Sequence, residues 1–200
     1  MNRIVLVALV AVGAAGGSAR AATGTTLENL QAAYNGESNA SARYKAFAEK
    51  ADAEGYKAVA RLFRAASRSE AIHAQNHAAV IKALGGTPRA DIAAAAPRST
   101  KENLQAAIAG ESYERDTMYP EFVARAKQDG NGDAVRTLTL ARSAEIEHAK
   151  LYQAALDGLD GQRAAGAPVY VCPVCGYTSL ALPERCPSTG TAKERFERID

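Results

Sequence analysis

The chain has 200 residues, of which 47% are hydrophobic and 23% charged, and it contains no tryptophan. This composition is that of one ordinary globular domain with a small appendage. Its 24 basic and 22 acidic side chains nearly balance. They form no basic block, which argues against nucleic acid because its binding needs clustered lysines and arginines. We therefore expect a small molecule or another protein as the partner.

Residues 1–21 have the pattern of a secretory signal peptide. Arg3 precedes an apolar run at residues 4–15, and small residues lead to a candidate A-x-A cleavage site at residues 19–21. A short membrane anchor is the alternative, but the run is shorter than the roughly 20 apolar residues that span a bilayer. We expect cleavage, no membrane span in the mature chain, and a periplasmic or otherwise secreted protein.

The rest of the chain contains an internal repeat. The segment ENLQAA at residues 28–33 recurs at 102–107, an offset of 74, and Glu-x-x-His at 70–73 recurs at 145–148, an offset of 75. One inserted turn residue would explain the difference. Duplication at a fixed spacing indicates two copies of one supersecondary unit.

Each copy predicts two helices. Helix-forming residues with helical apolar spacing fill 25–50 and 56–84, and glycines interrupt the units at Gly55 and at residues 130–132. Ser99 or Thr100 can cap the third helix, and Pro120 should kink it. With residues 89–98 as a long crossover, the pattern predicts an all-α, ferritin-like four-helix bundle over residues 22–159.

A tail follows the bundle. Residues 160–168 are rich in glycine and alanine and indicate a flexible linker. Residues 169–200 are too few to fold by apolar burial alone and need a staple such as a metal ion. Three thiols cannot all pair, so a disulfide framework explains these cysteines poorly. They are Cys172, Cys175 and Cys186.

The repeated acids lie at matching heights in the two predicted hairpins, 13 to 19 residues from the turn glycines. That distance places them in one layer, roughly 25 Å from the turns at 1.5 Å per residue. In each Glu-x-x-His motif the imidazole shares a helix face with its carboxylate. The layer would therefore hold Glu37, Glu70, His73, Glu111, Glu145 and His148.

Such a layer predicts a pair of metal ions. Buried carboxylates without partners are costly, and cations at bonding distance remove that cost. Oxygen-rich ligands with one imidazole per metal suit iron or manganese better than copper or structural zinc. The alternative is that these side chains lie on a solvated helix face. For His77, four residues beyond His73, we expect a packing or surface role rather than ligation.

Over nearly the whole mature chain, the sequence resembles the rubrerythrin family. The resemblance rests on Gly36-Glu37, Glu70-x-x-His73, Gly110-Glu111-x-x-Glu114 with Met118-Tyr119-Pro120, Glu145-x-x-His148 and the cysteine tail. It implies that Glu70 and Glu145 bridge two metals, that Glu37 and Glu111 are terminal ligands, and that His148 holds the second iron. Glu114, whose equivalent in the first repeat is Ala40, and His73 would exchange at the other iron. Tyr44 and Tyr119 would hydrogen-bond the ligand carboxylates.

The tail resembles the family's rubredoxin-type domain with one ligand missing. Thr189 stands where the pattern has a fourth cysteine. Three interpretations stay open: a three-cysteine site completed by Thr189, water or another donor; a structural zinc site; or an empty relic, with or without a Cys172–Cys175 disulfide.

The resemblance implies a di-iron peroxidase that reduces hydrogen peroxide to water. The expected cofactors are two iron ions, with manganese as the alternative, and a third iron or zinc at the tail cysteines. Without a complete tail relay, the chain depends on another electron-donor protein. We expect a homodimer that acts on peroxide or dioxygen. The competing functions are a ferroxidase-type iron-binding protein without peroxide turnover and a metal-free helical interaction module.

Overall fold

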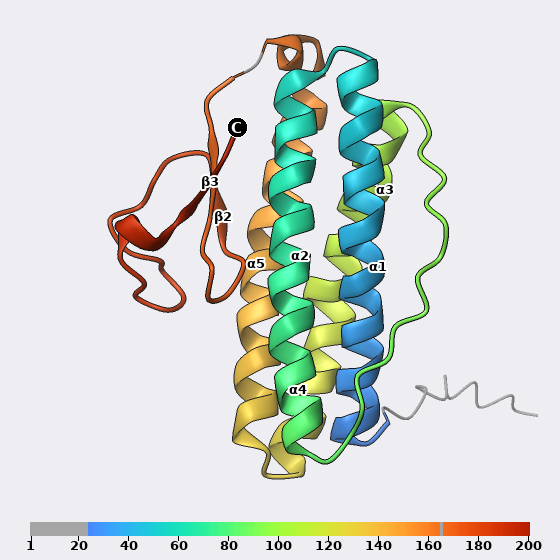
Figure 1. Cartoon of the computed structure of the whole chain (residues 1–200), viewed down its shortest axis with the longest axis vertical. Coiled ribbons are helices and arrows are strands. Elements are labelled where there is room, and N and C mark those ends of the chain that lie inside the picture. The colour runs from blue at the N-terminus through green and yellow to red at the C-terminus, as the bar shows by residue number, and fades with distance from the viewer. Residues whose placement is uncertain (1–23, 165) are drawn as a thin grey trace, which may run out of the picture.

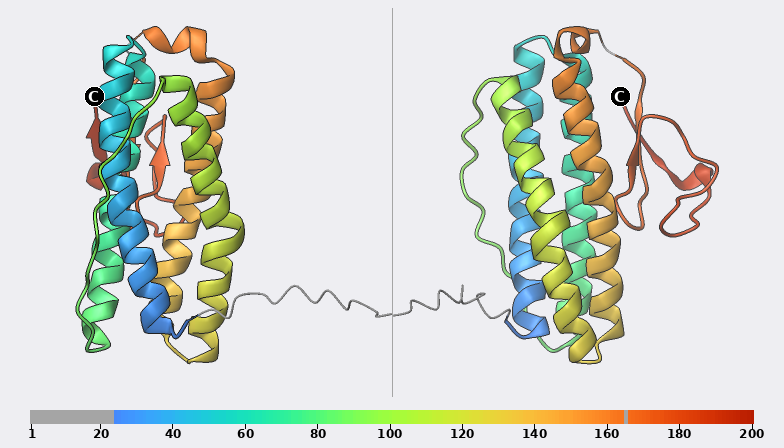
Figure 2. Two further views of the ribbon diagram at one scale, coloured as in Figure 1. Left: turned by 90° about the vertical axis from the view of Figure 1, so that its right-hand side faces the viewer. Right: turned by 180° about the vertical axis from the view of Figure 1, so that it is seen from behind.

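The computed structural model describes residues 24–164 and 166–200, so the predicted signal peptide lies outside the described residues. The described part is a four-helix bundle with a small β-containing tail on one side (Figures 1 and 2). Within these two ranges, no helix is both long and apolar enough to cross a membrane.

The first repeat folds into a helical hairpin of α1 (Thr26–Ala53) and α2 (Lys57–Ala83). Thr25 starts α1 through a capping box, in which its hydroxyl accepts from the Glu28 N–H while the Glu28 carboxylate accepts from the Thr25 N–H. Two helix-end donors are thereby satisfied. Gly55, with a φ of +84°, makes a left-handed turn that costs glycine little. The predicted hairpin and its turn are confirmed.

The second repeat runs through α3 (Thr100–Tyr113), the π-helical turn η1 (Glu114–Met118), α4 (Tyr119–Gln128) and α5 (Gly132–Asp157). Ser99 caps α3 with the same kind of box, now completed by Glu102. Asn131 caps α5 by accepting from the Ala134 N–H at 2.9 Å. The two hairpins therefore start their helices by the same local chemistry.

The second repeat is one residue longer than the first, and the extra residue lies in the π-helical turn. Equivalent residues before it are 74 apart, as in Glu37 and Glu111, and those after it are 75 apart, as in Tyr44 and Tyr119. Within η1 the Tyr119 N–H bonds to a carbonyl five residues back, which is how a helix accommodates one extra residue. The prediction that the extra residue lies in a turn between helices is wrong. The interruption expected at Pro120 takes the form of this turn, and Pro120 lies in the first turn of α4, where its missing N–H costs least.

A long crossover joins the hairpins. Residues 86–99 have no regular secondary structure and run along the outside of α1 from one end of the bundle to the other (Figure 1). Asn35 and Asn39 of α1 hold this segment. The Asn35 side chain accepts from the Asp91 N–H at 2.8 Å, and Asn39 donates to the Asp91 carbonyl at 2.8 Å. These side chains supply hydrogen bonds to a backbone that has no helix or strand partner.

The apolar core consists of two clusters at opposite ends of the bundle. The first contains Tyr44, Phe47, Phe63, Leu104 and Tyr152, and the second contains Leu30, Ile81, Tyr119, Ala126 and Leu138. The middle of the helices lies between the two clusters, and there the buried side chains are polar.

The tail packs on α2 and α5 (Figure 2). Its sheet has the order β2-β1-β3 with antiparallel pairs, formed by β1 (Val169–Val171), β2 (Thr178–Ser179) and β3 (Glu197–Ile199). Val169 and Val171 pack against Ala65 and Ile72 of α2. The tail therefore buries apolar surface against the bundle in addition to its own cysteine cluster.

The described residues of the predicted linker include a short helix and contacts with the bundle. Leu159–Arg163 forms a short 3-10 helix, η2, and its last residue donates to the Glu54 carbonyl at 3.1 Å. Arg61 of α2 donates to the carbonyls of Gly166 and Ala167 at 2.9 and 2.8 Å. Arginine side chains thus hold this segment against the bundle.

Candidate metal centre

The polar layer between the two apolar clusters brings together the six side chains that the repeat singles out. Each is at most 1% exposed. The alternative of a solvated helix face is therefore wrong. They come from four helices: Glu37 from α1, Glu70 and His73 from α2, Glu111 from α3, and Glu145 and His148 from α5.

Their ligand atoms form two overlapping groups. One group is Glu37, Glu70, His73 and Glu145, and the other is Glu70, Glu111, Glu145 and His148. In each group, one atom from every residue lies within 4.8 Å of the others. Glu70 and Glu145 belong to both groups, so two cations held there would share these two carboxylates.

The two imidazoles face the shared carboxylates. His73 Nδ1 lies 2.8 Å from Glu70 Oε2 and 3.1 Å from Glu145 Oε1. His148 Nδ1 lies 2.9 Å from Glu145 Oε2 and 3.2 Å from Glu70 Oε1. None of these contacts has hydrogen-bond geometry, so among the described residues both Nδ1 atoms and all four shared oxygens have no hydrogen-bond partner. Buried polar atoms in this condition are costly unless a cation binds among them.

The tail fixes the tautomer of both histidines. His73 Nε2 lies 3.0 Å from the Cys175 carbonyl oxygen, which can only accept. His148 Nε2 lies 3.0 Å from the Thr178 hydroxyl, which gives its own proton to the Gly176 carbonyl at 2.9 Å. Both rings therefore carry their proton on Nε2 and present the Nδ1 lone pair to the layer, the arrangement by which metal-binding histidines are oriented. Sequence analysis missed Thr178, because no local pattern links the tail to α5.

Burial and mutual repulsion shift the acid pKa values apart. Burial, Glu114 and the shared carboxylates raise the pKa of Glu37 well above its ordinary value. Burial and Glu70 raise the pKa of Glu111 to about 8. Burial opposes ionisation of Glu70, but His148 and His73, when they are protonated on Nδ1 as well, lower its pKa to about 2. The layer holds more acid than two histidines can neutralise, which favours cations at this place.

Two buried tyrosines contact the outer carboxylates. Tyr44 donates to Glu111, and Tyr119 donates to Glu37. The structure thus places both tyrosines against acids of the layer, and each binds the glutamate of the other repeat.

Glu114 lies in η1, at the border of the layer. It is half-buried and belongs to neither group among the described residues. Burial is the main cause of the raised pKa of Glu37, and the charge of Glu114 is the next largest. Ala40, the equivalent residue in the first repeat, is buried, so the layer has this additional acid on one side.

His77 is fully buried one turn beyond His73 and is not part of either group. Its Nε2 lies 3.2 Å from the Tyr119 hydroxyl, and its Nδ1 lies 3.0 Å from the Thr137 hydroxyl. The expected packing role is thus combined with two polar contacts. Thr137 was not predicted as a site residue. The sequence does show that the equivalent position in the first repeat, 75 residues earlier, is Leu62, so the two repeats differ here.

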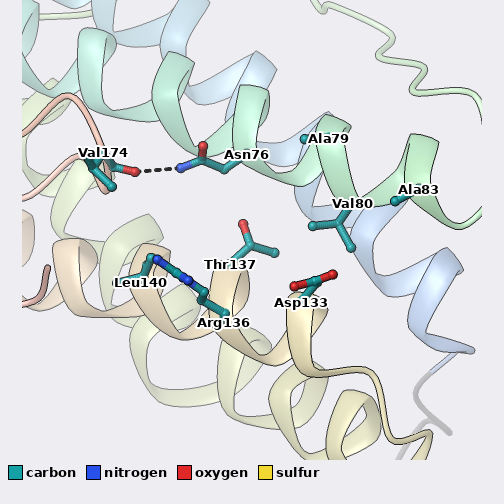
Figure 3. A pocket seen from close by; sticks show the side chains of 9 residues that line it. All are labelled: Asn76, Ala79, Val80, Ala83, Asp133, Arg136, Thr137, Leu140 and Val174. Atoms are coloured by element: carbon teal, nitrogen blue, oxygen red, sulfur yellow. Dashed lines mark hydrogen bonds between the residues drawn. The ribbon is translucent and has the colours of Figure 1, made fainter.

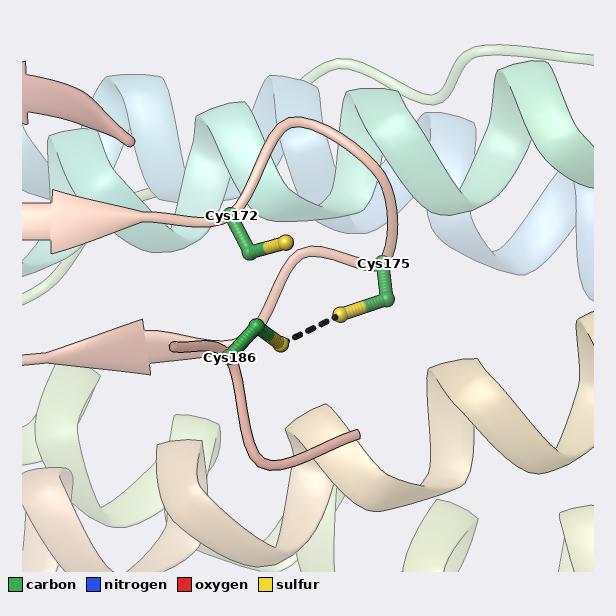
Figure 4. A group of neighbouring side chains, drawn as sticks. All are labelled: Cys172, Cys175 and Cys186. Atoms are coloured by element: carbon green, nitrogen blue, oxygen red, sulfur yellow. Dashed lines mark hydrogen bonds between the residues drawn. The ribbon is translucent and has the colours of Figure 1, made fainter. Parts of the chain in front are cut away.

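The three tail cysteines are free, buried and converge on one point (Figure 4). Cys175 Sγ lies 3.5 Å from Cys186 Sγ, and Cys172 Sγ lies 3.6 Å from the Thr189 hydroxyl. Thr189 therefore lies beside the cluster, in contact with Cys172. The Cys175 thiol lowers the pKa of Cys172 to about 4, a condition that favours a metal-binding thiolate.

Comparisons with known proteins agree with this geometry. Residues 28–156 match the family model described as Rubrerythrin. Rubrerythrin-2 of Clostridium acetobutylicum is 40% identical over 86% of this chain and 95% of its own. Nigerythrin of Nitratidesulfovibrio vulgaris is 38% identical over 88% of each chain. A solved structure of fully reduced, all-ferrous nigerythrin matches with a TM-score of 0.84 at 36% identity, covering 92% of this chain and 91% of that chain.

Proposed function

This chain belongs to the rubrerythrin family, and from that premise we propose that it is a di-iron oxidoreductase that reduces hydrogen peroxide to water. Its ferritin-like bundle with a rubredoxin-like tail is the predicted fold class. The observation that carries the proposal is the pair of ligand groups that share Glu70 and Glu145. A single isolated acidic cluster would not hold two metals close enough to act on one peroxide.

The donor set suits iron. Each group offers three carboxylates and one imidazole, and such oxygen-rich sites favour iron or manganese. The solved relative in its all-ferrous state supports iron. In this assignment Glu70 and Glu145 would be shared by the two metals, Glu37 and Glu111 would bind one each, and His73 and His148 would complete the two sites. Glu114 would be an additional carboxylate on the His73 side.

When bound, the two irons supply the two electrons that reduction of one peroxide takes. The protein supplies the rest. The buried helices keep bulk water from the layer, and the tail's acceptors hold both Nδ1 lone pairs in place. Tyr119 and Tyr44 steady the outer carboxylates. Two protons must also reach the site, because peroxide, two electrons and two protons give two waters.

The test is peroxide consumption by the iron-loaded protein with an artificial reductant. We expect two irons per chain and steady turnover of peroxide. Two bound irons without any peroxide turnover would contradict the proposal.

The altered tail favours a second candidate. The tail has three cysteines, with the Thr189 hydroxyl beside Cys172. It therefore lacks the four-thiolate site that suits electron relay. An iron-binding, ferroxidase-type protein needs no such relay. Rapid oxidation of added ferrous iron by dioxygen would support this alternative, if the protein also reduced negligible peroxide when an artificial electron donor was supplied.

We further propose that electrons arrive from a separate donor protein, that two chains form a homodimer, and that the tail cysteines bind iron or zinc. The pattern of residues 1–21 supports export to the periplasm or beyond. Sequencing the N-terminus of the protein from its native source tests the last point, because an exported protein would begin near residue 22.

A further inference from the structure

A surface pocket of about 370 Å³ lies between α2 and α5, next to the tail (Figure 3). Its lining is partly polar and includes Asn76, Asp133, Arg136 and Thr137. Asn76 also donates to the Val174 carbonyl at 2.9 Å, which holds the tail loop at the pocket's edge. The pocket is open to solvent, and Thr137 lines it with 7% of its surface exposed.

From Thr137, polar contacts continue inward without a gap. The Thr137 hydroxyl lies 3.0 Å from His77 Nδ1, and His77 Nε2 lies 3.2 Å from the Tyr119 hydroxyl. Tyr119 contacts Glu37. Three side chains thus connect an open surface pocket to a carboxylate of the metal centre.

The donors in this series all point the same way. A metal-binding carboxylate only accepts, so the Tyr119 O–H points to Glu37. The Tyr119 oxygen then accepts from Nε2–H of His77. A neutral imidazole with its proton on Nε2 accepts at Nδ1, so the Thr137 O–H points to His77. Burial, aided by His73, lowers the pKa of His77 to about 3, in agreement with a neutral ring.

The equivalent place in the other repeat has no such series. At the offset of 75, Leu62 replaces Thr137 and Tyr152 replaces His77. Leu62 can neither donate nor accept. The buried Tyr152 hydroxyl has no hydrogen-bond partner among the described residues. Among the described residues, the contacts that connect Glu37 through Tyr119 and His77 to Thr137 therefore have no counterpart at the equivalent positions 62 and 152.

We propose that Thr137, His77 and Tyr119 form a proton path from this pocket to Glu37, and this inference rests on the proposed peroxide reduction. Glu37 takes the Tyr119 proton, Tyr119 takes the Nε2 proton of His77, Nδ1 takes the Thr137 proton, and Thr137 takes one from pocket water. One proton enters and one arrives, and no charge stays on the path. It resets when the two hydroxyls rotate and the imidazole ring, which now carries its proton on Nδ1, reorients to present that proton to Tyr119. Two such cycles deliver the two protons consumed per peroxide.

The first test is a single turnover of the diferrous full chain with hydrogen peroxide. Thr137→Val removes the hydroxyl, and we expect the rate to fall on the order of tenfold or more, with unchanged iron content and a changed solvent deuterium isotope effect. Thr137→Ser keeps a hydroxyl and should restore the rate. Thr139→Val makes the same replacement at an exposed site of the same helix and should leave the rate unchanged. A Thr137→Val rate and isotope effect equal to those of the wild type would overturn the proposal.

The second test does not depend on turnover. In the full chain loaded with Zn²⁺, ¹⁵N NMR of His77 should show a neutral ring protonated on Nε2, and Thr137→Val should shift the Nδ1 resonance. A proton on Nδ1, or an imidazolium at neutral pH, would overturn the path. If the wild type does not react with peroxide, the proposed function fails. The path is then decided by the His77 tautomer and its response to Thr137→Val.

Discussion

Tyr44 and Tyr119 occupy equivalent places 75 residues apart, and each donates its hydroxyl to the outer glutamate of the other repeat. This reciprocal pairing ties the two hairpins together at the level of the metal centre. Behind the two rings the repeats differ. Tyr44 packs among aromatic rings: its ring centroid lies 5.8 Å from that of Phe63 and 5.6 Å from that of Tyr152. Tyr119 lies beside His77 instead. The duplicated frame has kept the acids and changed what surrounds them.

Glu145→Ala should abolish the paired site. Glu145 is one of two carboxylates shared by both ligand groups, so its loss removes a ligand from each metal. Iron analysis should give clearly fewer than two irons per chain. Circular dichroism should show that the helices remain.

The matched control is Glu147→Ala, two residues along the same helix. Glu147 pairs with Lys150 at 2.8 Å and lies outside both groups, so its replacement should leave two irons. Two irons and an oxo-bridge absorption band in Glu145→Ala would contradict the assignment of Glu145 as a bridge.

Gly176→Ala should loosen the tail from the bundle. Gly176 has a φ of +74°, and an added Cβ would lie 2.2 Å from Ser69 Oγ and 2.4 Å from His73 Nε2. The backbone cost and the clash together should lower the free energy of unfolding by about 3 kcal/mol. Faster hydrogen exchange in β1 and β2 would report the detachment.

Gly190→Ala is its control. Gly190 also has a positive φ, of +69°, but nothing lies within 4 Å of an added Cβ. It should show only the backbone cost, about 1–2 kcal/mol, with tail exchange unchanged. Equal effects of the two variants would mean that the contact with Ser69 and His73 contributes nothing.

Thr189→Cys should complete a four-thiolate site in the tail. The Thr189 hydroxyl lies 3.6 Å from Cys172 Sγ, so a thiol there would lie close enough to join the other three as a fourth ligand. With Co²⁺ as the probe, thiolate-to-metal absorption should rise by about a third relative to the wild type. Ser188→Cys adds a thiol one residue away and should not increase it. No increase in Thr189→Cys would place residue 189 outside the site.

Glu54→Gln should change how the free energy of unfolding falls at acid pH. Hydrogen bonds from Thr100, whose N–H lies 2.8 Å from Oε2, and Lys50 at 3.0 Å lower the pKa of Glu54 to about 2. The unfolded chain binds this proton more readily, so the contribution is complete above the ordinary pKa of 4.5 and is lost as pH falls from there to about 2. Urea unfolding of the variant should show lower stability above pH 4.5 and a shallower decline below it. Glu49→Gln removes an exposed acid of the same helix and should keep the wild-type slope.

The repeat made much of the bundle predictable. The hairpins, their turn glycines and the level of the acids follow from 3.6-residue periodicity and from the matched distances of Glu37 and Glu70 from Gly55. The position of the extra residue did not follow. A turn and a π-helical turn both absorb one residue, and only contacts across the bundle, such as that of Tyr119 with Glu37, decide between them.

The contacts of the tail with the bundle were also beyond sequence analysis. His73 meets the Cys175 carbonyl, and His148 meets Thr178. These pairs are far apart in the chain, and one partner is a main-chain atom that carries no sequence signature. His77 and Thr137 were obscured for a related reason, because a buried histidine and a threonine on separate helices form no motif.

The tail contacts His73 through the Cys175 carbonyl and His148 through the Thr178 hydroxyl, whereas its three sulfur atoms gather in a cluster of their own. The two tasks of this small domain are therefore separable. A substitution at residue 189 can therefore change the cysteine cluster while the Cys175 carbonyl and Thr178 still orient His73 and His148. A variant that binds no metal among its cysteines would keep the tail as a structural support for the bundle histidines.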